Sequence, residues 1–400
     1  MHGTSPPESQ RNLSRGLILL LATACGAMVA NLYYAQTLID TIGPEIGLSP
    51  GVAGAITTLT QLGYGAGLAL FVPLGDLFEN KRLALLSTAG AILGCLGIAA
   101  SNGPVSFLAA SLITGICATG AQVVLPLASH LAVKERQGRV IGTIMSGLLF
   151  GIMLARPVAS FLADAISWRA VFLLSAGLMA AIGIALWFVC PTRKPETKLG
   201  YGAILGSVWG QLRRHRALRL RAFYQAMLFA AFNLFWTAAP LELLRNFDFT
   251  QQQVAWFALA GAGGALAAPL AGSLADRGLM WWTSFGALLM LTLSFIGADV
   301  AVAATSVAAF VIAAILIDTG VQLNQITGQK IIFALSSDAR ARVNAAYMTV
   351  MFVVGASGSL IGSATFEHGG WTLSALTGAA IGGIALVIFL LFDRGASDPD

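Results

Sequence analysis

The feature that most constrains this chain is a series of twelve apolar runs, each about as long as a helix that crosses a bilayer. The first six lie at 16–39, 51–74, 83–100, 105–130, 139–162 and 170–190, and the second six at 219–242, 252–275, 281–298, 302–327, 342–365 and 371–392. A bilayer core takes roughly 20 residues of α-helix, and a helix satisfies its own backbone hydrogen bonds there. The runs therefore predict an all-α integral membrane protein with twelve transmembrane helices.

The composition excludes a large soluble protein with a buried core. Of the 400 residues 57% are hydrophobic and 10% are charged, whereas a soluble domain carries about 25% charged residues. The net charge of +5 does not indicate a nucleic-acid partner, because the bases lie in turns between apolar runs. We expect a monomer in the lipid bilayer of an inner or plasma membrane.

The residue types that bind metals or perform catalysis are sparse and scattered. The four cysteines and four histidines have neither disulfide nor metal-ligand spacing. The chain also lacks a Gly-Lys-Ser/Thr loop of the kind that binds ATP phosphates. We expect no enzymatic activity, no metal and no cofactor, so transport would draw on an ion gradient or on the substrate's own gradient.

The distribution of Lys and Arg predicts the orientation in the membrane. When the runs are traced back and forth, all but three of the 23 bases fall on one side, the exceptions being Arg156, Arg169 and Arg245. Basic loops stay in the cytoplasm, so both termini and the central segment are expected there. The predicted regions are a disordered tail at 1–15, a six-helix half at 16–190, a linker with an amphipathic segment at 191–218, a second half at 219–392 and a tail at 393–400.

The two sets of six runs are related by an internal repeat. Asn31-Leu-Tyr-Tyr in the first run matches Asn233-Leu-Phe-Trp in the seventh, and Asp164…Trp168 matches Glu367…Trp371 at nearly the same offset. Each set has an even number of spans, so the halves have the same orientation. This parallel repeat suits alternating access around a central cavity.

Charged turns between the runs resemble the signature of the major facilitator superfamily. The turn after the second run keeps Leu74, Asp76, Lys81 and Arg82 of the family motif, and its repeat keeps Gly272, Leu274, Ala275, Asp276 and Arg277. The resemblance implies two six-helix halves around a central cavity and a cytoplasmic gate of charge pairs. The gate residues it indicates are Asp76, Lys81, Arg82, Glu135, Arg139, Gly272, Asp276, Arg277, Asp338 and Arg342. The alternative for Asp76 and Asp276 is plain N-capping of the following helices.

Polar and aromatic side chains inside the runs are the candidates for the substrate cavity. Polar groups are costly in hydrocarbon and usually face the bundle interior, and the family resemblance implies a cavity lined by spans one, four, seven and ten. The candidates are Asn31, Tyr33, Tyr34, Gln122, Asn233, Phe235, Trp236, Gln322 and Gln325. For each amide the alternative is an interhelical hydrogen bond, and for each aromatic ring it is ordinary packing.

Two charged residues inside the runs are candidates for coupling. Asp318 is the only carboxylate deep in a run and heads a helical stripe that continues through Gln322 and Gln325. A buried carboxylate can load and release a proton as its surroundings change, although pairing with a neighbouring base is the alternative. Arg156 stands where the antiporter branch of the family has a glycine, and it needs an anionic ligand or an acidic partner such as Asp40 or Glu242.

These observations lead to two transport hypotheses and one of another class. The first is a proton-coupled exporter of small organic molecules, favoured by the glycine-rich fifth run and the few charges inside the spans. The second is a proton-coupled importer of a small, possibly anionic metabolite, favoured by Arg156. A non-transporting receptor or lipid-handling scaffold is the third. The antiporter resemblance departs at Ser111, where that branch has an arginine.

Overall fold

The computed structural model describes residues 13–133, 136–192, 200–267, 270, 272–274, 277–336 and 339–393, and every regular element among them is a helix. The first half contains α1 (Arg15–Ala30), α2 (Ile39–Glu45), α3 (Ala55–Leu70), α4 (Asn80–Ala100), α5 (Pro104–Ala118), α6 (Gly120–Leu131), α7 (Gln137–Ala165) and α8 (Trp168–Val189). Short 3₁₀ helices lie at η1 (Tyr34–Thr37), η2 (Pro50–Val52) and η3 (Val72–Asp76).

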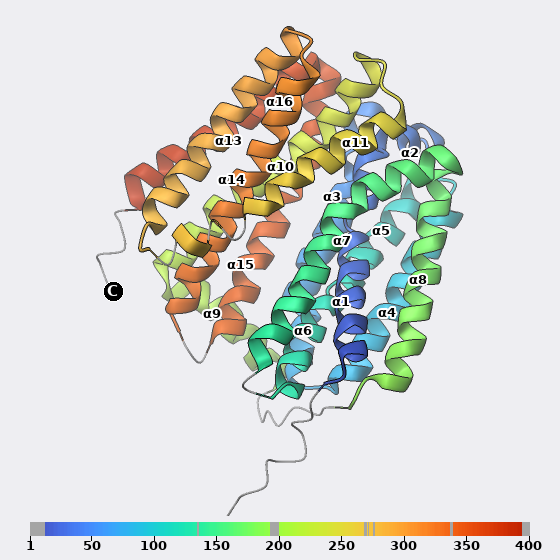
Figure 1. Ribbon diagram of the computed structural model, residues 1–400, viewed down its shortest axis with the longest axis vertical. Helices are drawn as coiled ribbons and strands as arrows, with labels where there is room; N and C mark the ends of the chain where they lie inside the picture. Colours follow the sequence, from blue (N-terminus) through green and yellow to red (C-terminus); the bar gives the residue numbers. More distant parts are fainter. Residues whose placement is uncertain are drawn as a thin grey trace, which may run out of the picture.

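The linker and the second half are also helical. The linker forms α9 (Tyr201–Arg214), and the second half contains α10 (Arg216–Arg245), α11 (Gln251–Gly261), η5 (Ala262–Ala267), α13 (Met280–Ala303), α14 (Val307–Ala334), α15 (Arg340–Gly355) and α16 (Ser357–Phe392). Figure 1 shows the two halves side by side, with α9 at the end of the bundle where α1 begins.

Nine helical stretches in the described part of the chain are long and apolar enough to cross a membrane. The other expected spans are present, but they are either interrupted or merged with a neighbour. The first is divided, because α1 ends at Ala30 and short helices follow it. The eighth is α11 with η5, and α15 and α16 together form one stretch that holds the last two spans. Within α16 the chain bends at Gly370, where φ is +63°, a value that suits glycine because it has no Cβ.

Glycines allow α1 and α7 to cross with their backbones in contact. A Cβ placed on Gly151 would lie 2.2 Å from the carbonyl oxygen of Gly26, and one on Gly147 would lie 2.5 Å from that of Ala22. Small residues let membrane helices approach this closely. The glycine-rich fifth run noted in the sequence is therefore the surface against which the first span packs.

The two halves touch most closely at the end of the bundle opposite the start of α1. There the Gly54 amide donates to Ser363 Oγ at 3.0 Å, and Thr58 Oγ1 donates to the Ala356 carbonyl at 2.8 Å. Figure 1 shows the helices of the halves close together at this upper end and diverging toward the lower end. At the lower end α9 links the halves, because Tyr201 Oη donates to the Leu70 carbonyl at 2.7 Å while Val208 is buried against the second half.

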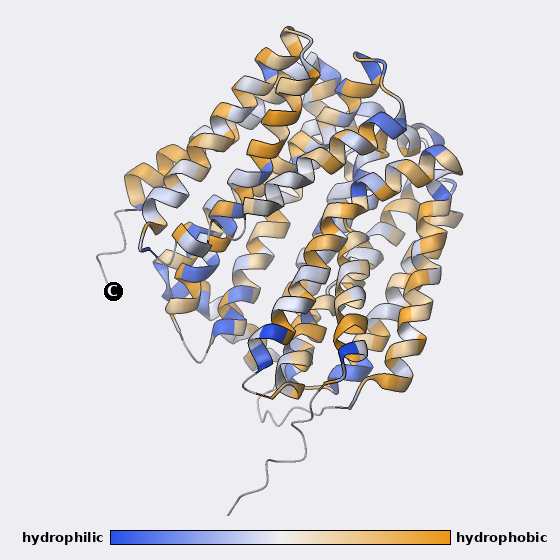
Figure 2. Cartoon of the chain, in the orientation of Figure 1, coloured by the Kyte–Doolittle hydropathy of each residue, from blue (hydrophilic) through white to orange (hydrophobic). Residues whose placement is uncertain are grey.

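Hydropathy along the helices fits a membrane protein. Figure 2 shows hydrophilic residues gathered near the ends of the helices and hydrophobic residues along much of their length. Large apolar side chains such as Leu93 (69% exposed), Phe188 (79%) and Ile184 (62%) point outward. A soluble monomer rarely exposes apolar surface on this scale, so these side chains contact lipid. The all-helical membrane fold predicted from the sequence is confirmed.

Candidate functional site

Arg156 lies between the two halves in a cage of aromatic rings. It projects from α7, and its Cζ atom lies 4.9 Å from the ring centre of Tyr33 in the first half. On the other side it lies 5.0 Å from the ring centre of Phe232 and 4.6 Å from that of Trp236, both on α10. Rings at these distances attract a cation through their π faces. The cage therefore holds a buried positive charge at the junction of the halves.

Only part of the Arg156 guanidinium is hydrogen-bonded. Its Nε donates to Gln36 Oε1 at 3.0 Å, whereas Nη2 is buried without a partner in the described part of the protein. The acids considered as partners from the sequence are engaged elsewhere: Asp40 accepts from Arg245, and Glu242 accepts from Asn246 at 2.6 Å. Arg156 is only 4% exposed, so its free N–H groups point into protein or into an enclosed space.

A second buried arginine has both an ion-pair partner and a hydrogen-bond partner within the chain. Arg221, near the start of α10, forms an ion pair with Asp393 at 2.8 Å and donates to Ser284 Oγ at 2.7 Å. A buried cation without a partner is costly because its hydration is lost. The charge of Arg221 is therefore paired within the chain, whereas the charge of Arg156 has no acidic partner among the described residues.

Asp318 lies close to Arg156 but does not contact it. Its Oδ1 accepts a hydrogen bond from Trp236 Nε1 at 2.8 Å, so the same indole ring borders both charges. Asp318 is 8% exposed, and the described residues place no Lys or Arg nitrogen within 4.0 Å of its carboxylate. The backbone of η5 covers it, since a Cβ on Gly264 would lie 2.4 Å from Asp318 Cβ. No basic side chain among the described residues therefore pairs with Asp318 in this structure.

A chain of amides connects this charged site to the contact between the halves. Asn233 Oδ1 accepts from Gln36 Nε2 at 3.2 Å and from Gln61 Nε2 at 2.8 Å. Its Nδ2 donates to Gln61 Oε1 at 2.8 Å and to the Gly355 carbonyl at 3.1 Å. Gln36 and Gln61 are not among the cavity residues predicted from the sequence. The rule applied to the other amides, that polar residues in apolar runs face the interior, identifies both.

The structure brings some of the predicted cavity residues to this site and places others elsewhere. Tyr33, Asn233 and Trp236 meet here, as described above. Asn31 instead accepts from Ser175 at 2.7 Å within the first half. Phe235 is fully buried in an aromatic cluster of the second half, with its ring centre 5.7 Å from those of Phe310 and Trp371.

The remaining predicted cavity residues lie around the site. Gln122 donates to Tyr64 Oη at 3.1 Å. Gln322 and Gln325 are half-buried on α14, beyond Asp318 toward the end where α1 begins. Tyr34 lines a groove of about 510 Å³ between α1, α7 and α8.

Several of the described gate residues lie at or near the starts of α4, α7 and α15, which Figure 1 places at the lower end of the bundle. Asp76 is exposed at the end of η3, and Arg82 pairs with Glu79 at 3.1 Å. Asp76 does not cap the next helix, because Glu79 occupies the N-cap of α4. The other described members are half-buried or exposed, and they are Lys81, Arg139, Gly272, Arg277 and Arg342. Glu135, Asp276 and Asp338 lie outside the described residues.

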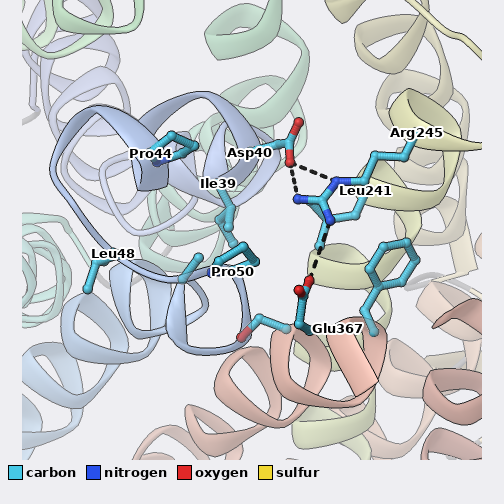
Figure 3. A pocket seen from close by; sticks show the side chains of 11 residues that line it. Ile39, Asp40, Pro44, Leu48, Pro50, Leu241, Arg245 and Glu367 are labelled. Atoms are coloured by element: carbon cyan, nitrogen blue, oxygen red, sulfur yellow. Dashed lines mark hydrogen bonds and ion pairs between the residues drawn. The ribbon is translucent and has the colours of Figure 1, made fainter. Parts of the chain in front are cut away.

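An ionic cluster closes the opposite end of the bundle. Figure 3 shows Arg245 of α10 between Asp40 of α2 and Glu367 of α16, beside a pocket of about 180 Å³. Arg245 Nε donates to Asp40 Oδ1 at 3.0 Å, and Nη1 lies 3.6 Å from Glu367 Oε2. Asp40 belongs to the first half, so this cluster joins the halves where they are closest.

Comparisons with known proteins agree with this architecture. The chain is 43% identical over 389 residues to "Uncharacterized transporter YgaY" of Escherichia coli O157:H7, covering 97% of this chain and 98% of the relative. It is 26% identical over 270 residues to "Chloramphenicol resistance protein" of Streptomyces lividans, covering 65% and 67% of the two chains. Its fold matches a POT family transporter crystallised with 5-aminolevulinic acid, with a TM-score of 0.78 at 14% identity, over 96% of this chain and 98% of that one.

The family model described as Major Facilitator Superfamily matches residues 19–234 and 221–399, that is, both halves. A match to each half is what the internal repeat predicts, and the family's fold implies twelve spans. The chain therefore belongs to the Major Facilitator Superfamily, whose members are membrane transporters of small molecules and not enzymes.

Proposed function

We propose that this protein is a proton-coupled exporter of small organic molecules that works by alternating access. In this mechanism Asp318 carries the proton and Arg156 holds the opposite charge beside it. The protein would act as a monomer in the inner or plasma membrane, with both termini in the cytoplasm, as the distribution of Lys and Arg favours. No cofactor is needed, because the proton gradient supplies the energy.

The observation that carries the proposal is the position of Asp318 at the junction of the halves. The carboxylate is buried and accepts a hydrogen bond from Trp236, and no cation among the described residues contacts it. A group placed there exchanges one set of surroundings for another when the halves move. Such a change alters the relative free energies of its charged and neutral forms, which is the requirement for a proton carrier.

The contacts between the halves support a two-state mechanism. In this structure the end that holds Asp40 and Arg245 is closed, and the helices diverge toward the end where α1 begins. The exposed position of Asp76 fits a gate that is open at that end. With the termini in the cytoplasm, the structure would represent the inward-facing state.

Export is the direction that the sequence and one relative favour. The α1–α7 crossing depends on glycines, as the fifth run suggested, and few charges line the site. The relative named for chloramphenicol resistance is consistent with removal of a small organic compound. These features bear on direction, whereas Asp318 bears on coupling.

Everted membrane vesicles test the coupling. Chloramphenicol and a panel of small organic compounds would be added to energised vesicles that hold a pH-sensitive dye. Proton release on substrate addition should occur with the unaltered protein and disappear in Asp318→Asn. Asp299→Asn, a half-buried carboxylate on α13, is the matched control and should keep the response. Unchanged proton release in Asp318→Asn would remove Asp318 from the mechanism.

Uptake of an anionic metabolite together with a proton is the second candidate. The unpartnered Nη2 of Arg156 favours it, because a bound anion near Asp318 would stabilise the protonated carboxylate. The two candidates move the substrate in opposite directions. An exporter raises the resistance of cells to its substrate, whereas an importer raises the accumulation of its substrate in right-side-out vesicles with an inward proton gradient.

A further inference from the structure

The central site holds two opposite charges that are close together, buried and incompletely paired. Arg156 is 4% exposed and Asp318 is 8% exposed. Trp236 borders both, with its ring centre 4.6 Å from Arg156 Cζ and its Nε1 2.8 Å from Asp318 Oδ1. Two buried charges that do not contact each other are costly unless something completes their hydrogen bonds. The arrangement is therefore complementary to a ligand that brings a charge of each sign.

The Arg156 side of the site is shaped for an anionic group. Tyr33, Phe232 and Trp236 surround the guanidinium, and Gln36 takes its Nε. The Nη edge remains, and the buried Nη2 has no partner among the described residues. A carboxylate matches this edge, because its two oxygens accept from the planar fork of the guanidinium.

The Asp318 side is shaped for a cationic or donor group. Among the described residues, the Trp236 N–H alone bonds to this carboxylate, at Oδ1. The second oxygen can accept from an ammonium group, and a protonated amine would bring a positive charge into direct contact with the carboxylate. The aromatic rings between the two charges would contact the apolar body of such a ligand.

We propose that the substrate is amphoteric, with an anionic group bound at Arg156 and a protonated amine bound at Asp318. This inference rests on the proposed function in placing the substrate at the coupling site. It also supplies a reason for exchange with protons. A proton on Asp318 and an ammonium group on Asp318 exclude each other, so the site is occupied by one or the other.

The groups that face Asp318 set how its occupancy responds to pH. They come from three directions: Arg156 of α7, Tyr33 at the end of the first span and Trp236 of α10, while η5 presents its backbone at Gly264. Of these, Arg156 carries a charge and Tyr33 is neutral in the physiological range. Binding of an amphoteric ligand should therefore weaken as the pH falls, because the proton competes for the carboxylate.

Matched sets of four compounds test the charge requirement. Each set contains a free amino acid, its amide, its N-acetyl derivative and its N-acetyl amide, with phenylalanine, tryptophan, leucine and methionine as parents. Binding to the purified protein in detergent would be measured by thermal shift and by tryptophan fluorescence. At least one parent should bind, and blocking either charged group should weaken its binding by about tenfold or more, which is about 1.4 kcal/mol.

Variants assign each charge to its residue. Arg156→Gln should abolish the difference between a parent and its amide, and Asp318→Asn should abolish the difference between a parent and its N-acetyl derivative. Arg156→Lys should restore part of the first difference. Each comparison is made within one variant, so a loss of stability does not confound it. Arg221→Lys, which alters a buried arginine that is already paired, should leave both differences intact.

The outcomes separate this inference from the proposed function. If none of the parents binds, or if the N-acetyl amides bind as well as the parents, the substrate is not amphoteric and the inference fails. Binding in detergent needs neither a gradient nor a direction. A positive result together with a failed vesicle assay would therefore leave the inference standing, and proton release without selective binding would leave only the proposed function.

Discussion

Arg245 of α10 donates its Nε to Oδ1 of Asp40 on α2 at 3.0 Å, and this ion pair joins the two halves at the end where they are closest. Both side chains are roughly one-third exposed. Exposed ion pairs contribute about 0.2 to 1 kcal/mol each. The pair therefore biases the closed state of this end without fixing it, as an alternating mechanism requires.

Removal of the pair should open this end more often. In Arg245→Gln the closed state loses its bonds to Asp40 and Glu367, and we expect up to about a fivefold shift toward the open state for each pair lost, from energies of this size. Thiol labelling of a cysteine at Thr41 would report the shift in a background in which the half-buried Cys117 is replaced by Ser, since Cys25, Cys95 and Cys190 are buried. A matched control is Glu45→Gln, which removes an acid that pairs within one half. Equal labelling of both variants would contradict the proposed role.

A bulky residue at Gly54 should prevent closure of the same end. A Cβ there would lie 2.0 Å from the Ser359 carbonyl oxygen, which is backbone of the opposite half. Gly54→Leu should therefore shift the protein to the alternative state and reduce transport while the protein still inserts. Gly177→Leu, at a position with nothing within 4 Å, is the control. Distances between spin labels on α3 and α15 would measure the change, and unaltered distances in Gly54→Leu would refute it.

The sequence predicted the spans well because the bilayer imposes one simple rule. A helix needs about 20 apolar residues to cross, and charged turns mark the ends. The first span was predicted as a continuous run over 16–39, but α1 ends at Ala30. The cause is Asn31, whose Oδ1 accepts from Ser175 and Cys95 and whose Nδ2 donates to Ala27. Ser175 and Cys95 lie on other helices, α8 and α4, so the break depends on tertiary packing.

The site was only partly predictable for a related reason. Arg156 and Asp318 stood out because charges inside apolar runs are rare. Phe235 and Trp236 are neighbours in sequence, yet successive residues of an α-helix point about 100° apart. Trp236 reaches Asp318, whereas Phe235 joins the aromatic cluster of the second half. The sequence does not give the rotation of α10 about its axis relative to the other helices, so it could not show which of these two side chains faces the site.

The amide cluster around Asn233 should contribute measurably to the stability of this state. Asn233→Ala removes bonds to Gln36, Gln61 and the Gly355 carbonyl and leaves these buried groups unsatisfied. A buried unsatisfied group costs about 1 to 3 kcal/mol, so the unfolding midpoint in detergent should fall by several degrees. A double-mutant cycle with Gln61→Ala would show coupling between the two residues. Additive effects would mean that the cluster does not act as a unit.

Acidification should weaken the contact between Glu45 and the start of α8. Hydrogen bonds from Arg169 and Trp168 lower the pKa of Glu45 below its ordinary value of about 4.3. A carboxyl group with a lowered pKa stabilises the folded state fully above its ordinary pKa, and this contribution is lost as the pH falls through the lowered value. Because Glu45 is 46% exposed, the contribution is at most about 1 kcal/mol. Unfolding midpoints of the unaltered protein and of Glu45→Gln should therefore differ at pH 7 and converge in strong acid. A difference that persists or grows on acidification would show that the carboxylate is not stabilised by these two donors.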